Sequence, residues 1–188
     1  MLEFRDVSFK YEEDEEPMMT DLSFHVEDGE FVSIIGASGC GKSTIFRLIN
    51  GLEKPQKGGI FVNGRSISEQ KNYSAFMPQK DLLLPLRTIE KNVCLPMEIM
   101  RVPEDERRKA ARAALEQVGL LDYAEKFPKD LSGGMKQRVA FARTLLSGAD
   151  MLLLDEPFSA LDYLTRVDMQ EWLLSQWQDS GKTIIFIT

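Results

Sequence analysis

Short apolar runs alternate along the chain with segments whose apolar residues recur at helical spacing. The runs predict buried strands at Phe31–Ile35, Gly58–Val62, Tyr73–Met77, Met151–Leu154 and Thr183–Ile187. Two further strands are predicted near the start, at Leu2–Tyr11 and Met18–Val26. Because most of these strands are apolar on both faces and alternate with helices, we expect a parallel α/β sheet that is covered on both faces.

The middle of the chain has a different pattern. From Thr88 to Leu146 the spacing of apolar residues is helical throughout. One helix is predicted at Glu104–Val118, with Pro103 in its first turn and Gly119 at its end. A later helix should run to about Gln178. These segments predict a helical insertion within the α/β fold.

Composition narrows the class of protein. The chain has 188 residues, of which 43% are hydrophobic, and a net charge of −7, so one acidic domain is expected. Such a chain lacks the basic surplus that general binding of nucleic acid or anionic lipid requires. The acidic run 12–16 is read as a solvated loop rather than a cation site. Neither a signal peptide nor an apolar run of about 20 residues is present, which predicts a cytoplasmic protein.

The glycine-rich segment Gly36–Thr44 has the spacing G-x-x-x-x-G-K-[ST] between a predicted strand and a predicted helix. Glycines let successive backbone N–H groups turn inward, and the start of the helix adds a positive dipole, so the segment predicts a cradle for nucleotide phosphates. Lys42 is expected to bridge the β- and γ-phosphates, and the Ser43 hydroxyl to bind Mg²⁺. The predicted binding residues are Gly36, Ser38, Gly39, Cys40, Gly41, Lys42, Ser43 and Thr44.

Two acidic residues follow the apolar run Met151–Leu154. Asp155 at the end of a buried strand can hold Mg²⁺ together with Ser43, and Glu156 can polarise an attacking water. An acidic pair that caps the next helix is the alternative interpretation, and it is weakened by the presence of the phosphate loop.

Ser132-Gly133-Gly134 predicts a second anion site at the start of a helix, where a hydroxyl, unhindered amides and the helix dipole coincide. An ordinary helix cap would explain the serine but not two glycines, which weaken a helix. Two phosphate sites and one apparent nucleotide point to a partner subunit.

With these motifs in order, the sequence resembles the nucleotide-binding subunit of ATP-binding cassette (ABC) transporters over nearly its whole length. The resemblance implies ATP and Mg²⁺ as cofactors. It also implies a P-loop NTPase (RecA-like) core with a mostly parallel sheet, an N-terminal antiparallel β subdomain and an inserted α-helical subdomain. The core would comprise residues 1–80 and 149–188, and the helical subdomain residues 81–148.

The resemblance also assigns roles. Tyr11 would stack on adenine, Gln79 would contact Mg²⁺ and the reacting centre, and Leu131–Gln137 would be the family signature, with Ser132, Gly133, Gly134 and Gln137 at the nucleotide. Asp162, in the segment Ser159–Asp162 that would cross the dimer interface, would also contact the nucleotide. The implied catalytic residues are Glu156, Lys42 and Gln79, and the implied metal ligands are Ser43, Gln79 and Asp155. Two copies would enclose two ATP molecules head to tail.

The family places a switch histidine after the strand that matches Thr183–Ile187, and this sequence stops at Thr188. His25, on an early strand, is expected to be an ordinary surface or half-buried residue. We therefore expect a domain cut before the histidine that binds Mg-ATP but whose turnover is weak or absent. A non-hydrolysing, ATP-dependent regulatory module is the alternative.

The apolar residues in Leu82–Leu86 and Val93–Met97 are read either as core or as the surface that meets a membrane subunit. The resemblance favours separate permease subunits and an extracytoplasmic solute-binding protein, with this chain on the inner face of the membrane. Met77–Val93 and Asp155–Asp162 look closest to the nitrate, sulfonate and taurine import group, although Leu86 replaces that group's usual tryptophan. A DNA-repair cassette would need long heptads or a basic surface, and a small-molecule kinase would leave Leu131–Gln137 unexplained.

The two cysteines, Cys40 and Cys94, have no metal-like spacing. Because Cys40 lies inside the phosphate loop, we hypothesise that it is a reactive thiol that ATP protects. The alternative is that Cys40 is only a small spacer.

Overall fold

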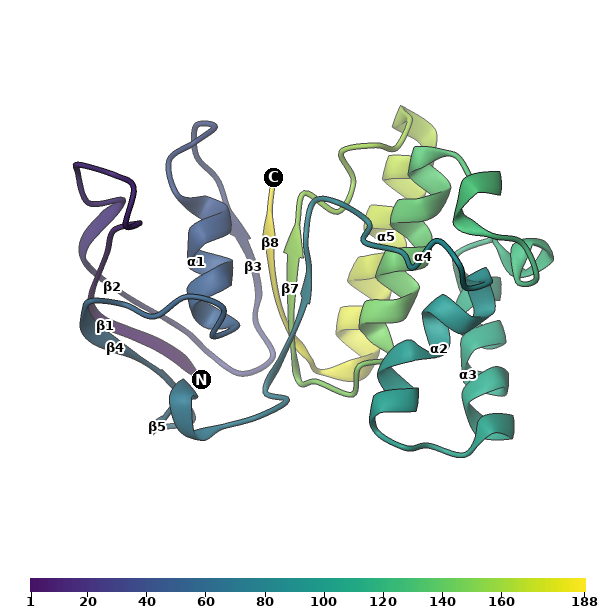
Figure 1. The fold of residues 1–188 in the computed structure, drawn as a ribbon, viewed down its shortest axis with the longest axis horizontal. Helices are drawn as coiled ribbons and strands as arrows, with labels where there is room; N and C mark the ends of the chain where they lie inside the picture. The colour runs from purple at the N-terminus through teal and green to yellow at the C-terminus, as the bar shows by residue number, and fades with distance from the viewer.

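Two four-stranded sheets and five α-helices make up the fold, and the computed structural model describes all of residues 1–188 (Figure 1). The antiparallel sheet has the order β2 (Met19–Val26), β1 (Leu2–Phe9), β4 (Lys57–Val62), β5 (Arg65–Ser66). The parallel sheet has the order β3 (Phe31–Ile34), β8 (Thr183–Ile187), β7 (Met151–Asp155), β6 (Ser74–Met77). The predicted fold class is confirmed.

The helices are α1 (Lys42–Ile49), α2 (Ile89–Ile99), α3 (Glu104–Gln117), α4 (Gly133–Leu145) and α5 (Tyr163–Ser180). Short 3₁₀ turns lie at Ile67–Glu69, Leu121–Tyr123 and Pro128–Asp130. None of the helices has both the length and the apolar character that crossing a membrane would take.

Strand β7 separates the two hydrophobic cores because its side chains alternate between the faces of the parallel sheet. Leu152 and Leu154 pack into the core that contains α2, α3, α4 and α5. Leu153 packs into the other core, where Phe46 of α1 meets residues of β1 and β4. Helix α1 thus lies between the two sheets, whereas α4 and α5 lie on the opposite side of the parallel sheet and α2 and α3 lie farther from it (Figure 1).

Helix α4 belongs to both the helical insertion and the core. Phe141 of α4 packs edge-on against Trp172 of α5, with ring centroids 5.1 Å apart. Buried residues of α2 and α3, such as Val93 and Leu115, join the same core. The predicted division at residues 81 and 148 therefore stays a prediction, since no break in the packing marks its second boundary.

Element ends differ from the sequence prediction where tertiary contacts decide them. Strand β1 ends at Phe9 because its pairing with β2 stops at Phe9 and Met19, which leaves Tyr11 in a loop rather than in the predicted strand. Pro103 precedes α3 as its cap residue instead of lying in its first turn. Helix α5 continues to Ser180, and Gly181 ends it with a φ of 63°.

Candidate nucleotide site

The loop between β3 and α1 is shaped by its glycines. Gly39 and Gly41 have φ angles of 80° and 95°, which favour glycine, and a Cβ on Gly36 would lie only 2.8 Å from Cys40 Sγ. No side chain caps the first turn of α1. The first N–H groups of this helix are therefore available to an anion.

Lys42 closes this loop on itself. Its Nζ donates to the carbonyl oxygens of Gly36 and Ala37 at 2.7 and 2.9 Å, and both bonds are exposed. Phosphate oxygens would offer the ammonium stronger, charge-assisted partners than these neutral carbonyls. The lysine is thus held beside the loop in a position from which it can transfer to an anion.

Asp155 ends β7 beside this loop and is 5% exposed. Burial raises the pKa of Asp155, and the negative charge of Glu156 adds to this, while the hydrogen bond with Ser43 and the charge of Lys42 lower it. A buried carboxylate that its neighbours compensate only in part gains from a nearby cation. No group of three or more His, Cys, Asp or Glu side chains is arranged so that it could hold a metal ion. Ser43 and Asp155 offer the oxygen ligands that Mg²⁺ prefers.

Glu156 has an unusual backbone. Its φ of 49° is uncommon for a residue with a side chain. The hydrogen bond from its N–H to the Ile187 carbonyl, at 3.2 Å, ties it to the end of β8. The Glu156 carboxylate accepts a hydrogen bond from Gln79 Nε2 at 2.7 Å. Left-handed residues of this kind concentrate at functional sites, where the surrounding structure maintains them.

Tyr11 lies beside the start of α1. Its hydroxyl is 3.0 Å from Thr44 Oγ1, and its ring packs edge-on against Phe9 at a centroid distance of 4.8 Å. Two contacts thus orient the half-buried ring next to the phosphate loop. The sequence contained no signal for the neighbouring Met18, whose sulfur would lie 3.1 Å from a Cβ on Gly41.

The start of α4 forms the second predicted anion site. Ser132 Oγ accepts a hydrogen bond from the Met135 N–H at 3.3 Å and so caps the helix. A Cβ on Gly134 would lie 3.0 Å from Leu161 Cδ2 and 3.1 Å from the Ala160 carbonyl oxygen, whereas one on Gly133 would meet only Ala160 Cβ at 3.9 Å. Gly134 thus permits close packing within the chain, and Gly133 is exposed.

The structure does not bring the two anion sites together. Helices α1 and α4 lie on opposite sides of the parallel sheet (Figure 1), and their side chains enter different cores. The residues gathered at the carboxyl ends of the parallel strands are Lys42, Ser43, Gln79, Asp155 and Glu156.

Gln137 is expected at the nucleotide, and this stays a prediction. The residue is 5% exposed, and its side-chain amide has partners within the chain. Its Oε1 accepts from the Ala160 N–H at 3.1 Å, and its Nε2 donates to Ser159 Oγ at 3.0 Å. The Gln137 side chain thus joins the start of α4 to the segment after Glu156 and positions the two relative to each other.

Asp162 caps α5 through a 3.1 Å hydrogen bond from the Thr165 N–H. Hydrogen bonds from Thr165 hold the pKa of the exposed Asp162 carboxyl below its usual range. His25 is an exposed residue of β2, as expected.

The fold and this site define a nucleotide-binding domain of the P-loop type. A family model described as "ABC transporter" matches residues 19–159. The chain belongs to the ABC transporter family and is an ATP-binding domain of that family.

Relatives and solved structures agree with this assignment. The chain is 42% identical over 188 residues to the formylaminopyrimidine import ATP-binding protein ThiZ of Halalkalibacterium halodurans, covering all of this chain and 73% of that protein. It is 44% identical over 167 residues to the taurine import ATP-binding protein TauB of Rhizobium johnstonii, covering 89% of this chain and 64% of that protein. The dimeric ATP-binding cassette MJ0796, in a post-hydrolysis state with ADP and phosphate, superposes with a TM-score of 0.91 at 32% identity, covering 100% of this chain and 88% of that one. The chain thus spans about two thirds to three quarters of the length of these two curated relatives.

Proposed function

We propose that this chain binds Mg-ATP, hydrolyses it together with a second copy of itself, and so energises a membrane importer. The observation that carries the proposal is the gathering of Lys42, Ser43, Asp155, Glu156 and Gln79 at one edge of the parallel sheet. In parallel sheets, ligands bind at the carboxyl ends of the strands, and this edge has the cation, the hydroxyl and the carboxylates that phosphoryl chemistry needs.

Each residue then has a distinct task. The phosphates are held by the amides of Gly36–Thr44 and by Lys42, which exchanges its loop carbonyls for phosphate oxygens. Tyr11 stacks on the adenine. Ser43, Asp155 and Gln79 would hold Mg²⁺, which would supply neutralisation of the phosphate charge when bound. Glu156 accepts a proton from the attacking water or orients it, starting from its present contact with Gln79.

A second copy is proposed because α4, which begins at Gly133, lies on the opposite side of the parallel sheet from α1 and its phosphate loop. Exposed amides at the start of α4 are suited to the γ-phosphate bound by the partner. The similar cassette MJ0796 is dimeric. Asp162, at the start of α5, lies on the segment that would cross between the two copies.

The membrane subunit is proposed to meet the apolar segment after Gln79. Leu82 is 61% exposed and Leu86 is 91% exposed, and such side chains favour contact with an apolar partner. The similar proteins are named as import ATP-binding proteins for formylaminopyrimidine and taurine, which supports a small organic or anionic solute. A separate permease and an extracytoplasmic solute-binding protein complete this proposal.

The experiment measures equilibrium binding of Mg-ATP to the 188-residue chain together with release of phosphate from the same sample. Lys42→Ala should weaken binding about 10- to 100-fold, because hydrogen bonds to a charged group contribute about 1.5–3 kcal/mol. Lys71→Ala, an exposed lysine outside the site, is the control and should bind as the wild type does. Binding that survives Lys42→Ala, or that is absent from the wild type, contradicts the proposal.

A further inference from the structure

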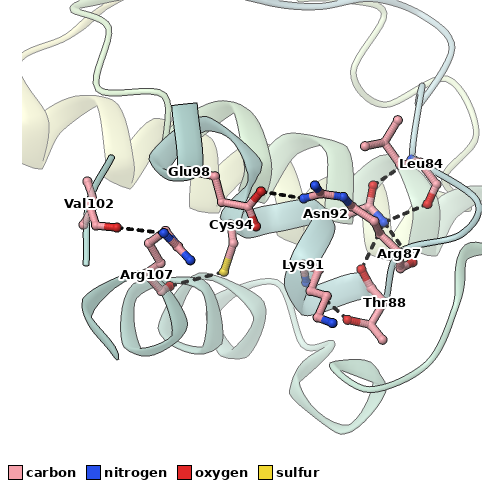
Figure 2. Close-up of polar contacts among 9 residues, drawn as sticks. All are labelled: Leu84, Arg87, Thr88, Lys91, Asn92, Cys94, Glu98, Val102 and Arg107. Atoms are coloured by element: carbon pink, nitrogen blue, oxygen red, sulfur yellow. Dashed lines mark hydrogen bonds and ion pairs between the residues drawn. The ribbon is translucent and has the colours of Figure 1, made fainter. Parts of the chain in front are cut away.

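Asn92, in the first turns of α2, is a fully buried amide with an unusual number of partners. It is 0% exposed. Its Oδ1 accepts from the Leu84 N–H at 2.7 Å, and the carbonyl oxygens of Leu84, Arg87 and Thr88 lie 3.1, 3.1 and 3.0 Å from its Nδ2, so one of the two N–H groups is shared between two acceptors (Figure 2). One side chain therefore supplies the hydrogen bonds that a turn usually obtains from its own backbone.

The segment held in this way, Leu82–Thr88, is called the leucine loop below. Other polar side chains hold its two ends. Arg143 of α4 donates to the Leu82 carbonyl at 2.9 Å, and Arg87 forms a 2.6 Å ion pair with Glu98 of α2, as Figure 2 shows for the second pair. The loop is thus fastened by buried and half-buried polar groups while Leu86 remains 91% exposed.

The same turn of α2 holds a second loop. The N–H groups of Ile89 and Glu90 donate to the carbonyl oxygens of Lys126 and Ala124, both at 2.9 Å. These are first-turn N–H groups, which have no partner inside the helix. The segment that they hold leads within a few residues to Ser132, the cap of α4.

Ion pairs to α3 stiffen this junction. Glu90 is 5% exposed and contacts Arg108 Nε at 3.0 Å and Arg112 at 2.8 Å. A buried carboxylate with two guanidinium partners resists displacement, because separation would leave its charge uncompensated. The first turn of α2 is therefore a rigid point that both loops share.

We propose that Asn92 is a positioning residue that fastens the leucine loop to this turn, and through the Ile89 and Glu90 N–H groups to the segment that precedes Ser132. The inference rests on the proposed function, because it takes the leucine loop as the surface that the permease contacts. Asn92 touches neither nucleotide nor reacting atoms and acts through the first turn of α2. A purely local role, in which Asn92 closes its own turn and nothing more, is the competing explanation.

Residue-resolved amide hydrogen exchange of the nucleotide-free, 188-residue chain separates the two explanations. In Asn92→Ala the Leu84 amide should exchange at least about fivefold faster, because a hydrogen bond contributes about 1 kcal/mol or more to protection. The amides of Ile89 and Glu90 should also exchange faster, although neither contacts Asn92 by its N–H. Faster exchange at Leu84 alone would overturn the proposal.

Gln70→Ala is the matched control. Gln70 Nε2 also donates to backbone carbonyls, those of Val62, Arg65 and Ser66, but in a turn of the antiparallel sheet. This variant should leave the exchange of Leu84, Ile89 and Glu90 unchanged. If Gln70→Ala accelerates these amides as much as Asn92→Ala does, the effect is global loss of stability and the proposal is wrong.

A second variant and a measurement of binding and turnover complete the test. Asn92→Asp keeps the side-chain volume and the acceptor for the Leu84 N–H, so it replaces Asn92→Ala if that variant does not fold, with the same outcome expected at Ile89 and Glu90. With Mg-ATP, Asn92→Ala should retain the wild-type Kd within about twofold while the maximal rate of phosphate release falls about tenfold. If the wild type binds no Mg-ATP, the proposed function fails, whereas the exchange experiment still decides the role of Asn92.

Discussion

Gln79 Nε2 donates a hydrogen bond to Glu156 Oε2 at 2.7 Å and so joins the ends of two neighbouring strands, β6 and β7. The residues are 77 positions apart in the sequence. The contact gives Glu156 a defined orientation without a nucleotide. Gln79 is followed directly by the segment that leads to the leucine loop.

Replacing Glu156 separates binding from turnover. Glu156→Gln preserves the size of the side chain but removes the base, so phosphate release should fall about 10²- to 10⁴-fold. The Kd for Mg-ATP should change by no more than about twofold, because the phosphate loop is intact. Glu53→Gln, outside this sheet edge, serves as the control. Release that persists in Glu156→Gln would show that another group activates the water.

The raised pKa of Asp155 predicts a dependence of stability on pH. Burial raises this pKa, so the folded chain holds the proton more tightly than the unfolded chain does. The contribution of Asp155 to stability is therefore present below its unfolded pKa and is lost as the pH rises through the folded pKa. At neutral pH the buried charge disfavours folding.

Asp155→Asn removes this charge. Without nucleotide, it should raise the Tm at pH 7 and leave the Tm unchanged at a pH below the unfolded pKa. With Mg-ATP the wild type should have the higher Tm, because it binds the ligand more tightly than Asp155→Asn and is stabilised more by it. Thermal unfolding across pH, with and without Mg-ATP, measures both effects. A variant less stable than the wild type at neutral pH without ligand would contradict the expected sign.

The two signature glycines should respond in opposite ways to alanine. Gly133 has room for a Cβ, so Gly133→Ala should stabilise the chain by up to about 1 kcal/mol through helix propensity. Gly134→Ala should destabilise it, since its Cβ would crowd Ala160 and Leu161. Denaturant unfolding measures both changes.

Dimerisation provides the second half of this test. Gly133→Ala should suppress ATP-dependent dimerisation although it stabilises the monomer, because the added methyl group covers the exposed amides proposed to meet the γ-phosphate of the partner. Analytical ultracentrifugation in the presence of ATP measures the dimer, with Glu156→Gln included in both proteins so that the ATP is not hydrolysed. Unimpaired dimerisation would place the partner's nucleotide away from Gly133.

The two cysteines should differ in reactivity. Cys40 is exposed, whereas Cys94 is buried and its pKa is raised to about 11 by burial, with Glu90 and Glu98 adding to the shift. Alkylation at pH 8 should modify Cys40 alone in the folded chain and both thiols in denaturant. Mg-ATP should slow the labelling of Cys40. Labelling at an unchanged rate would show that the bound nucleotide leaves this thiol open.

A charge on the leucine loop should disrupt recruitment to the membrane without affecting the nucleotide site. Leu86→Asp should abolish co-purification with a permease and leave the Kd for Mg-ATP unchanged, because Leu86 is 91% exposed and distant from the phosphate loop in sequence. Leu174→Asp, on α5 at 41% exposure, is the matched control and should still be recruited. Equal loss in both variants would argue against a specific surface at the leucine loop.

Much of this architecture could be read from the sequence, for local reasons. Apolar runs such as Met151–Leu154 have no polar face, so they can only be strands buried on both sides. The glycines of Gly36–Thr44 imply a tight loop because side chains disfavour the φ angles that it needs. The roles of Lys42 and Ser43 could also be predicted from the sequence, because the phosphate-binding residues lie within one continuous segment.

The three-dimensional structure decided what depends on contacts between distant segments. It placed Gln137 in a network with Ser159 and Ala160, two partners that the sequence pattern does not indicate. Pairing with β2 ended β1 before Tyr11, and packing carried α4 into the core. A side chain's partners across the fold are set by packing and burial, whereas the local pattern records only the conformations that its own segment can adopt.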